Sequence, residues 1–365
     1  MIHRLSRRDL LAAALAGALP WPAMAADGAR PPAMRRLIAN ENPYGPGPAA
    51  RAAAARAVPG SWRYAIREVG ALKAAIASLE GVEQSQVMVC AGSTEALRIG
   101  ALALAGQGGR VVAARPTFSF LPDYSRKLGC EVAEIDLDEA MVHDLDAMAA
   151  AVNASTRLVY ICNPNNPTGT RLDSEAVSAF LEAVGPRAPV LIDEAYLDLA
   201  PDWQSRTAVK DVKAGRPVIV TRTFSKLHGM AGLRVGYAIG PTELIKQLES
   251  LRVSMLSYPG ALAATASLAD SDFLSMSRAR ISEGRELATA ALNELGRRVI
   301  PSYGNFVFFD TGGSARAFAG GMRERGILTG MPSAAYPGFS RVSVGTVEDM
   351  QAFAVAARDY FGAGA

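Results

Sequence analysis

The sequence is poor in the features that mark disulfide-stapled domains, zinc modules and nucleic-acid-binding proteins. It has only three cysteines, Cys90, Cys130 and Cys162, an odd number without the paired spacing of a metal site, so we expect buried thiols and no bound metal. Its net charge is only +3. The first 25 residues hold three arginines and one aspartate, which leaves 35 basic and 34 acidic residues beyond them. So small an excess of charge gives no support to nucleic-acid binding.

What the sequence does have is length and apolar composition. Its 365 residues exceed what one hydrophobic core usually serves, and 50% of them are apolar against 20% charged. These values predict a folded body made of two packed units rather than a disordered chain. Outside the N-terminus, no apolar run is long enough to cross a membrane.

The first 25 residues predict an export signal. A basic stretch containing SRRDLL at 6–11 overlaps an apolar run over 10–19, and the small-residue pattern AMA follows at 23–25. This is the pattern of a twin-arginine signal peptide. The apolar run is about half of the roughly 20 residues that span a bilayer. We therefore expect a periplasmic or otherwise exported protein without stable membrane insertion after cleavage. A fortuitous basic amphipathic start remains the alternative.

The mature chain divides into three predicted parts. Residues 26–58 are rich in Pro, Gly and Ala and predict an N-terminal arm that packs on the smaller domain or on a partner subunit. In 59–256, apolar runs at 87–90, 110–114, 158–162, 190–192 and 218–221 alternate with helical patterns, which indicates a parallel sheet covered on both faces. In 257–365, long helical patterns around 270–295, 315–325 and 347–360 and strands at 306–309 and 341–344 predict a smaller α+β domain.

Polar residues follow four of these strands, where ligands bind in open α/β sheets. AGSTE at 91–95 opens a helix whose amides could hold a phosphate, although Ser or Thr at such a place is more often a plain N-cap. NPNNPTG at 163–169 is a stiff turn. Asp193 ends a buried strand and needs a cationic partner. Thr223, Ser225 and Lys226 follow the last strand, and Arg234 comes eight residues after the lysine.

One cofactor requires all of these groups. Pyridoxal 5'-phosphate needs a lysine for its Schiff base, an acid for its ring nitrogen, hydrogen bonds for its phenolic oxygen and donors for its phosphate. The order of NENPYGP at 40–46, NPNNPTG at 163–169, DEAY at 193–196, TFSK at 223–226 and AGLRVGY at 231–237 resembles the class I/II aminotransferases. The likeness covers about residues 37–360 and is closest to the histidinol-phosphate aminotransferase-like branch. It implies an α/β fold, PLP-dependent transferase fold type I, with a mostly parallel sheet between helices in the large domain.

The resemblance also implies roles for individual residues. Lys226 would hold the cofactor and move the Cα proton, Asp193 would face the pyridine nitrogen, and Asn166 and Tyr196 would donate to the phenolic oxygen. The phosphate would lie among five side chains: Ser93, Thr94, Thr223, Ser225 and Arg234.

Five further residues have a second interpretation or bear on the substrate. Phe118 would stack on the pyridine ring, or be ordinary core. Tyr64 would reach the phosphate of a neighbouring subunit, which implies a homodimer with composite active sites, or be a core tyrosine. Arg341 would bind the substrate carboxylate, although phosphate-binding relatives reuse this arginine. Asn42 and Asn305 would also contact substrate, or Asn305 would form a turn before the strand at 306–309.

The sequence predicts transamination between an L-amino acid, or a related amine such as histidinol phosphate, and a 2-oxo acid. Gly330 stands where histidinol-phosphate members usually carry a second arginine, so a cation for a substrate phosphate is missing. A PLP-dependent decarboxylase or C–S lyase is the alternative on the same fold. A nucleotide-dependent oxidoreductase lacks its Gly-x-Gly-x-x-Gly after any predicted strand. A non-catalytic binding protein would have no use for Lys226 together with Asp193.

Overall fold

The protein is described by a computed structural model that covers residues 34–106, 108–330 and 335–362. The predicted signal peptide and residues 26–33 of the predicted arm lie outside the described residues. Within those ranges, none of the helices combines the length and the apolar character needed to span a membrane. All three cysteines are free and buried, as the sequence indicates.

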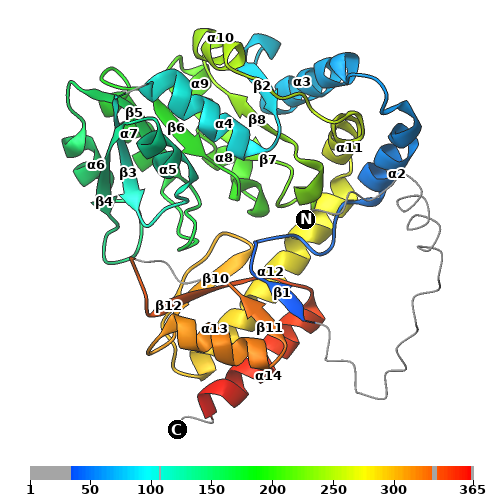
Figure 1. Cartoon of the computed structure of the whole chain (residues 1–365), viewed down its shortest axis with the longest axis vertical. Coiled ribbons are helices and arrows are strands. Elements are labelled where there is room, and N and C mark those ends of the chain that lie inside the picture. The colour runs from blue at the N-terminus through cyan, green and yellow to red at the C-terminus, as the bar shows by residue number, and fades with distance from the viewer. Residues whose placement is uncertain (1–33, 107, 331–334, 363–365) are drawn as a thin grey trace, which may run out of the picture. The chain divides into compact units, whose positions relative to one another are not determined.

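A seven-stranded, mostly parallel sheet forms the centre of the larger part, which confirms the predicted α/β fold (Figure 1). Its strands, in spatial order, are β2 (Val87–Cys90), β8 (Gly236–Ile239), β7 (Val218–Thr223), β6 (Val190–Asp193), β5 (Thr156–Cys162), β3 (Arg110–Arg115) and β4 (Glu131–Asp136). Only β8 runs antiparallel to its neighbours, β2 and β7. Each of the five apolar runs lies within one of these strands, whereas β4 and β8 are additional to the prediction.

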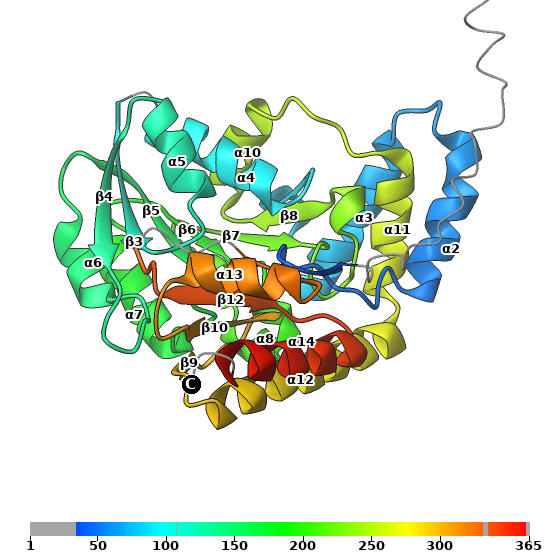
Figure 2. The same ribbon diagram turned by 60° about the horizontal axis from the view of Figure 1, so that its bottom comes forward.

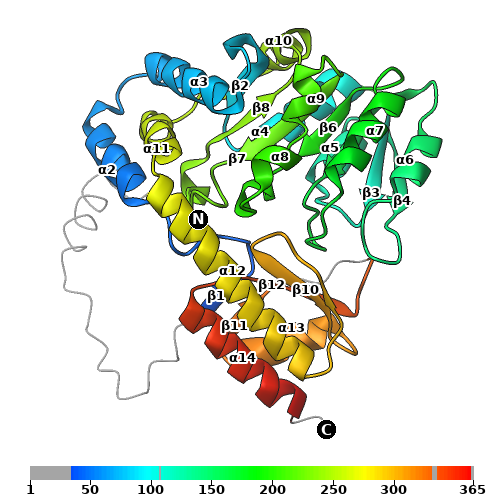
Figure 3. The same cartoon turned by 180° about the vertical axis from the view of Figure 1, so that it is seen from behind.

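Helices cover both faces of this sheet, which explains why the strands are apolar throughout. Successive strand residues point to opposite faces: Val190 and Ile192 of β6 belong to one buried cluster, whereas Leu191 belongs to the other. The helices on the Leu191 face are α4 (Ser93–Gly100), α5 (Phe120–Lys127) and α10 (Thr242–Ser250). The opposite face, seen in Figure 3, carries α3 (Ile66–Glu80), α6 (Leu145–Ala151), α7 (Ser174–Val184) and α9 (Val209–Lys213).

The smaller part has a hydrophobic core of its own around residues such as Phe309, Phe318 and Phe353. Its elements are α12 (Ser271–Glu294), β9 (Val299–Ile300), β10 (Phe306–Asp310), α13 (Ala315–Glu324), β11 (Ile327–Thr329), β12 (Phe339–Ser343) and α14 (Val347–Gly362). Three strands form a sheet in the order β12-β10-β9. Figure 2 shows α12 and α14 side by side against these strands.

The beginning of the described chain joins the two parts. Strand β1 (Arg35–Leu37) pairs in parallel with β11, and Leu37 is buried in the core of the smaller part. Helix α2 (Pro48–Ala57) packs instead against α11 (Tyr258–Leu268), beside α3. The predicted domain division at residue 257 stays a prediction, but α11 lies with the helices of the larger part. The chain passes between these elements through the segment 38–47.

Short helices complete the connections. They are α8 (Trp203–Arg206), the 3-10 turns η1 (Val58–Gly60), η2 (Gln84–Gln86), η4 (Leu197–Leu199) and η5 (Ala231–Leu233), and the π-helical η3 (Ala101–Ala105) that extends α4. Several longer helices begin at a side chain that accepts a backbone N–H, for example Asp173 before α7 and Asp270 before α12. Such N-caps satisfy amides that the helix itself leaves unpaired.

Candidate active site

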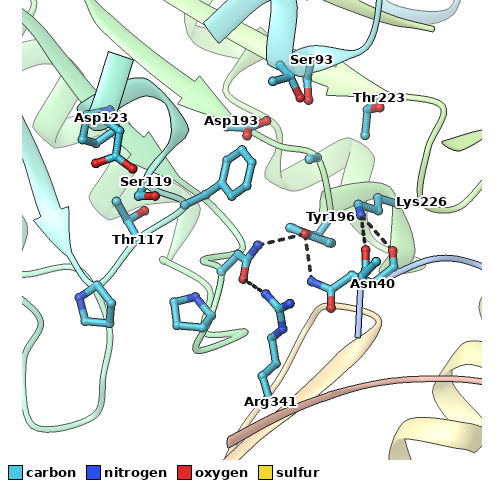
Figure 4. Close-up of a pocket in the computed structure, with 18 of the residues that line it drawn as sticks. Asn40, Ser93, Thr117, Ser119, Asp123, Asp193, Tyr196, Thr223, Lys226 and Arg341 are labelled. Carbon is cyan, nitrogen blue, oxygen red and sulfur yellow. Dashed lines mark hydrogen bonds between the residues drawn. The ribbon is translucent and has the colours of Figure 1, made fainter. Parts of the chain in front are cut away.

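A cavity of about 1030 Å³ lies where the loops after the parallel strands meet the segment 39–41 and β12 (Figure 4). It is lined by side chains that are far apart in the sequence. The predicted site residues that line it are Ser93, Thr94, Phe118, Asn166, Asp193, Tyr196, Thr223, Ser225, Lys226, Arg234 and Arg341. The structure therefore brings most of the predicted set into one place.

The end of the cavity predicted to take a phosphate is built from a helix start and an arginine. Gly92, with a φ of +79°, precedes α4, and a Cβ atom at this residue would lie 2.3 Å from Nη2 of Arg234. The guanidinium of Arg234 donates to the carbonyl of Ala231 at 2.9 Å and to Oγ of Ser225 at 3.4 Å. Thr223 donates to the same Oγ at 2.9 Å. These hydroxyl, amide and guanidinium donors fit a phosphate at the N-terminus of α4.

Asp193 is a buried carboxyl group at the end of β6, 2% exposed. Oδ1 accepts a hydrogen bond from the Thr221 hydroxyl at 2.9 Å, and no salt bridge reaches this carboxyl within the described ranges. Burial raises the pKa of Asp193 to about 6, although the Thr221 hydrogen bond and the Lys226 charge lower it. A buried carboxylate of this kind fits a protonated ring nitrogen, which would supply the missing cation.

Lys226 lies after β7 and points into the cavity (Figure 4). Its Nζ donates to the main-chain carbonyl of Asn40 at 2.8 Å and lies 5.3 Å from the centre of the Tyr196 ring. Desolvation, together with the positive charge of Arg341, lowers the pKa of Lys226 to about 8. A lysine with a lowered pKa holds more neutral amine near neutral pH, which is the form that attacks an aldehyde.

The Tyr196 hydroxyl, close to Lys226, is the centre of a cluster of side-chain hydrogen bonds. It accepts from Nδ2 of Asn166 at 3.2 Å and from Nδ2 of Asn40 at 3.1 Å. Arg341 donates through Nη1 to Oδ1 of Asn166 and through Nη2 to the carbonyl of Ile38 at 2.9 Å. Both of these acceptors are uncharged, so no carboxylate among the described residues neutralises the guanidinium of Arg341.

Three predicted residues do not line this cavity. Tyr64 is 78% exposed, so the alternative of a core tyrosine is wrong. Asn42 is buried and donates to the Leu227 carbonyl at 2.8 Å and to Oγ of Ser277 at 2.7 Å, so the structure gives it contacts to the protein where we expected substrate. Asn305 is also buried, and its Nδ2 donates to the carbonyl of Asn40 at 2.9 Å. Asn305 therefore acts on the cavity through the segment 39–41.

Sequence reasoning missed Asn40 and the outer rim of the cavity. Asn40 stands in the NENPYGP motif, in which the resemblance points to Asn42 as the substrate contact. The rim carries Arg126, which forms salt bridges with Asp123 at 3.0 Å and Glu134 at 2.6 Å. These residues lie on α5 and β4, outside every recognised motif. The described ranges hold no group of three or more His, Cys, Asp or Glu side chains arranged to bind a metal ion.

Comparison with known proteins agrees with the chemistry of these groups. The model of the family "Aminotransferase class I and II" matches residues 34–356. The histidinol-phosphate aminotransferase of Moorella thermoacetica is 35% identical over 330 residues, 89% of this chain and 84% of that protein. Histidinol-phosphate aminotransferase 1 of Thiobacillus denitrificans is 39% identical over 317 residues, 85% of this chain and 81% of that protein.

A solved structure extends the likeness to the fold. The histidinol-phosphate aminotransferase of Sinorhizobium meliloti in complex with pyridoxal-5'-phosphate superposes with a TM-score of 0.85 at 28% identity, covering 91% of this chain and 92% of that one. Because the family model spans nearly all of the described chain, the protein belongs to the class I and II aminotransferases and is a pyridoxal 5'-phosphate-dependent aminotransferase of fold type I.

Proposed function

We propose that this aminotransferase takes its amino group from an L-amino acid whose α-carboxylate binds Arg341. The observation that carries the proposal is the state of the arginines that line the cavity. Arg115 and Arg126 are held in salt bridges, and Arg234 belongs to the predicted phosphate end. Arg341 has no salt bridge among the described residues, and its two hydrogen bonds go to the uncharged Oδ1 of Asn166 and carbonyl of Ile38. A planar guanidinium whose charge is not neutralised by a protein carboxylate is suited to a substrate carboxylate.

Gly330 supports an amino acid over an amine that carries a phosphate. A Cβ atom at this residue would lie 2.9 Å from the carbonyl oxygen of Arg341 and 3.4 Å from its Nε and Nη2. A larger side chain there would press against the guanidinium, whereas glycine leaves Arg341 as the cation on this side. Since the relatives are named histidinol-phosphate aminotransferases, histidinol phosphate is the direct competitor.

The remaining residues serve the proton transfers and hold the cofactor. When bound, pyridoxal phosphate supplies an electron sink for the bonds at Cα of the substrate. Lys226, as a neutral amine, is placed to take the Cα proton and return it. Asp193 would hold the proton on the ring nitrogen, and the hydroxyl of Tyr196 would donate to the phenolic oxygen. Ser93, Thr94, Thr223, Ser225 and Arg234 would hold the phosphate.

Single-turnover kinetics test the substrate. The cofactor-loaded enzyme is mixed with individual L-amino acids and with histidinol phosphate, and the loss of the visible absorbance of the bound cofactor is followed. We expect amino acids to convert the cofactor, and R341K to raise their half-saturating concentration by tenfold or more, because lysine cannot form two parallel hydrogen bonds. Faster conversion by histidinol phosphate than by every amino acid would contradict the proposal.

We also propose that the enzyme acts as a homodimer. Exposed apolar side chains occur in two segments, with Trp62 79% and Tyr64 78% exposed in one, and Val253 95% exposed in the other. A Cβ atom at Gly60 would lie 2.9 Å from the Tyr258 ring, so the chain next to the first segment approaches the chain next to the second. Such a patch is typical of an interface. Light scattering of wild-type enzyme should give twice the mass of the chain, and a monomer that still binds cofactor would rule out the composite site.

Export is a separate proposal that rests on residues 4–25. Fractionation of cells that express the full chain should find it outside the cytoplasm, with a new N-terminus after Ala25. Replacement of both Arg7 and Arg8 by lysine is expected to keep it inside, because the twin-arginine pair is part of the signal. An unprocessed wild-type chain in the cytoplasm would contradict this proposal.

A further inference from the structure

The hydroxyl of Tyr196 accepts two side-chain amides at once. Nδ2 of Asn166 donates to it at 3.2 Å, and Nδ2 of Asn40, which is labelled in Figure 4, donates at 3.1 Å. A phenol oxygen has one proton to donate and a limited capacity to accept. When two N–H groups occupy that capacity, the proton of the hydroxyl must point away from both amides. The two asparagine amides therefore fix the direction in which the Tyr196 hydroxyl donates.

Both amides are held in the orientation that this requires. Oδ1 of Asn40 accepts from the Ser343 hydroxyl at 2.9 Å, and that hydroxyl oxygen in turn accepts from the main-chain N–H of Asn40 at 2.8 Å. Oδ1 of Asn166 accepts from Arg341. Because each oxygen has its own donor, each Nδ2 is left to face Tyr196.

The backbone of Asn40 contributes separately. Its φ is +52°, in the left-handed region, which asparagine tolerates better than most other residues with a side chain. In this conformation its carbonyl accepts from Lys226 Nζ at 2.8 Å and from Asn305 Nδ2 at 2.9 Å. Asn40 itself is 2% exposed.

We infer that Asn40 is a positioning residue: its amide directs the Tyr196 hydroxyl into the cavity, and its carbonyl sets where the amine of Lys226 rests. This inference depends on the roles proposed above for Tyr196 and Lys226. It goes beyond them because it places control of both groups on the N-terminal segment. The electrostatics agree, since burial raises the pKa of Tyr196 to about 12 while Arg341 and then the Asn40 hydrogen bond lower it. Without Asn40, Tyr196 becomes a poorer donor.

The test uses the pH midpoint of the visible absorbance of the bound cofactor. Weaker donation by Tyr196 leaves more negative charge on the phenolic oxygen, which favours the protonated form of the lysine–cofactor link and raises the midpoint. N40G removes the amide but keeps the left-handed backbone. We expect N40G to raise the midpoint by about 0.5 pH unit or more, and Y196F to raise it further. In the double variant N40G/Y196F, the Asn40 effect should vanish, because it acts through the missing hydroxyl.

Two additional variants keep the test decisive. S343A removes the hydroxyl that orients the Asn40 amide and should shift the midpoint in the same direction by less, which gives a second measurement if N40G does not fold. S277A removes a buried contact of Asn42, two residues along the same segment, and should lower the melting temperature without moving the midpoint.

Several outcomes would overturn the inference. One is that Y196F moves the midpoint while N40G and S343A leave it unchanged. Another is that N40G shifts the midpoint as much in the Y196F background as in the wild type. A third is that S277A shifts the midpoint as much as N40G does. A wild-type enzyme whose bound cofactor shows no such titration, or a Y196F variant identical to wild type, would instead contradict the proposed roles themselves.

Discussion

The hydrogen bond from Thr221 to Asp193 offers a direct test of the proposed role of Asp193 at the ring nitrogen of the cofactor. Thr221 on β7 donates to Oδ1 of Asp193 at 2.9 Å, and both residues are buried. T221V removes this donor while nearly keeping the shape of the side chain. A hydrogen bond to a charged group contributes about 1.5–3 kcal/mol, and one pKa unit corresponds to about 1.4 kcal/mol. The substitution should therefore raise the pKa of Asp193 by about one to two units.

Binding of the cofactor with a protonated ring nitrogen favours a negatively charged Asp193, and this sets the direction of the pH effect. The pKa of Asp193 is raised to about 6, so its carboxyl group in the cofactor-free protein gains a proton as the pH falls through that value. A protonated carboxyl no longer stabilises the N–H of the ring. Wild-type affinity for pyridoxal phosphate should therefore fall as the pH drops below about 6, and in T221V this loss should begin at a higher pH.

Equilibrium dialysis of cofactor-free protein across the pH range measures this shift. The phosphate of the cofactor also titrates near pH 6. Its titration affects the binding curves of wild type and variants equally, so the difference between their midpoints reports on Asp193. T221S keeps the hydroxyl and is the matched control, with an expected midpoint close to wild type. Coincident midpoints for wild type, T221V and T221S would refute the argument that Thr221 tunes this carboxyl.

Three other predictions concern single residues. Lys226→Ala should abolish the cofactor adduct that mass spectrometry detects after borohydride reduction of the loaded enzyme. Cofactor uptake by the wild type should accelerate as the pH rises through about 8, where Lys226 loses its proton. Uptake at a rate independent of pH would contradict this. Gly92→Ala should weaken cofactor binding in dialysis, because the new Cβ would lie 2.3 Å from Arg234 Nη2 and the φ of +79° disfavours a side chain. Phe309→Ala, in the core of the smaller part, should lower the free energy of unfolding in urea by about 3–5 kcal/mol; a loss below 1 kcal/mol would show that this core repacks.

The sequence predicts the central strands well because they are buried on both faces. Runs such as 190–192 are apolar throughout, since neither face of β6 meets water. Strand β4 escapes this pattern, because it lies at the edge of the sheet and carries three carboxylates in six residues, Glu131–Asp136. Strand β8 begins with Gly236, within the AGLRVGY motif, so glycine and arginine interrupt its apolar pattern. Charged edge strands and short glycine-containing strands give little apolar signal.

The site residues that the sequence identifies are those that follow recognisable strands. Lys226 and Asp193 each follow a recognisable strand, and parallel strands bring their carboxyl ends to one edge, so motif order is enough to place them together. Asn40 has no such signal. Its partner Ser343 lies 303 residues away, and only the pairing of β1 with β11 beside β12 brings the two together. A contact set by the packing of distant elements cannot be read from local pattern.

Backbone strain shows where tertiary structure overrides local preference at this site. Among the described residues, three other than glycine have positive φ, namely Asn40, Met141 and Arg234, and two of them line the cavity. Such conformations cost about 1–3 kcal/mol each and persist only where surrounding contacts enforce them. At Arg234 the guanidinium is held by Ala231 and Ser225, and at Asn40 the backbone is held by Ser343 and Asn305. An arginine gives no local sign of a left-handed backbone, so motif order identifies the chemistry of this cavity while packing alone determines its geometry.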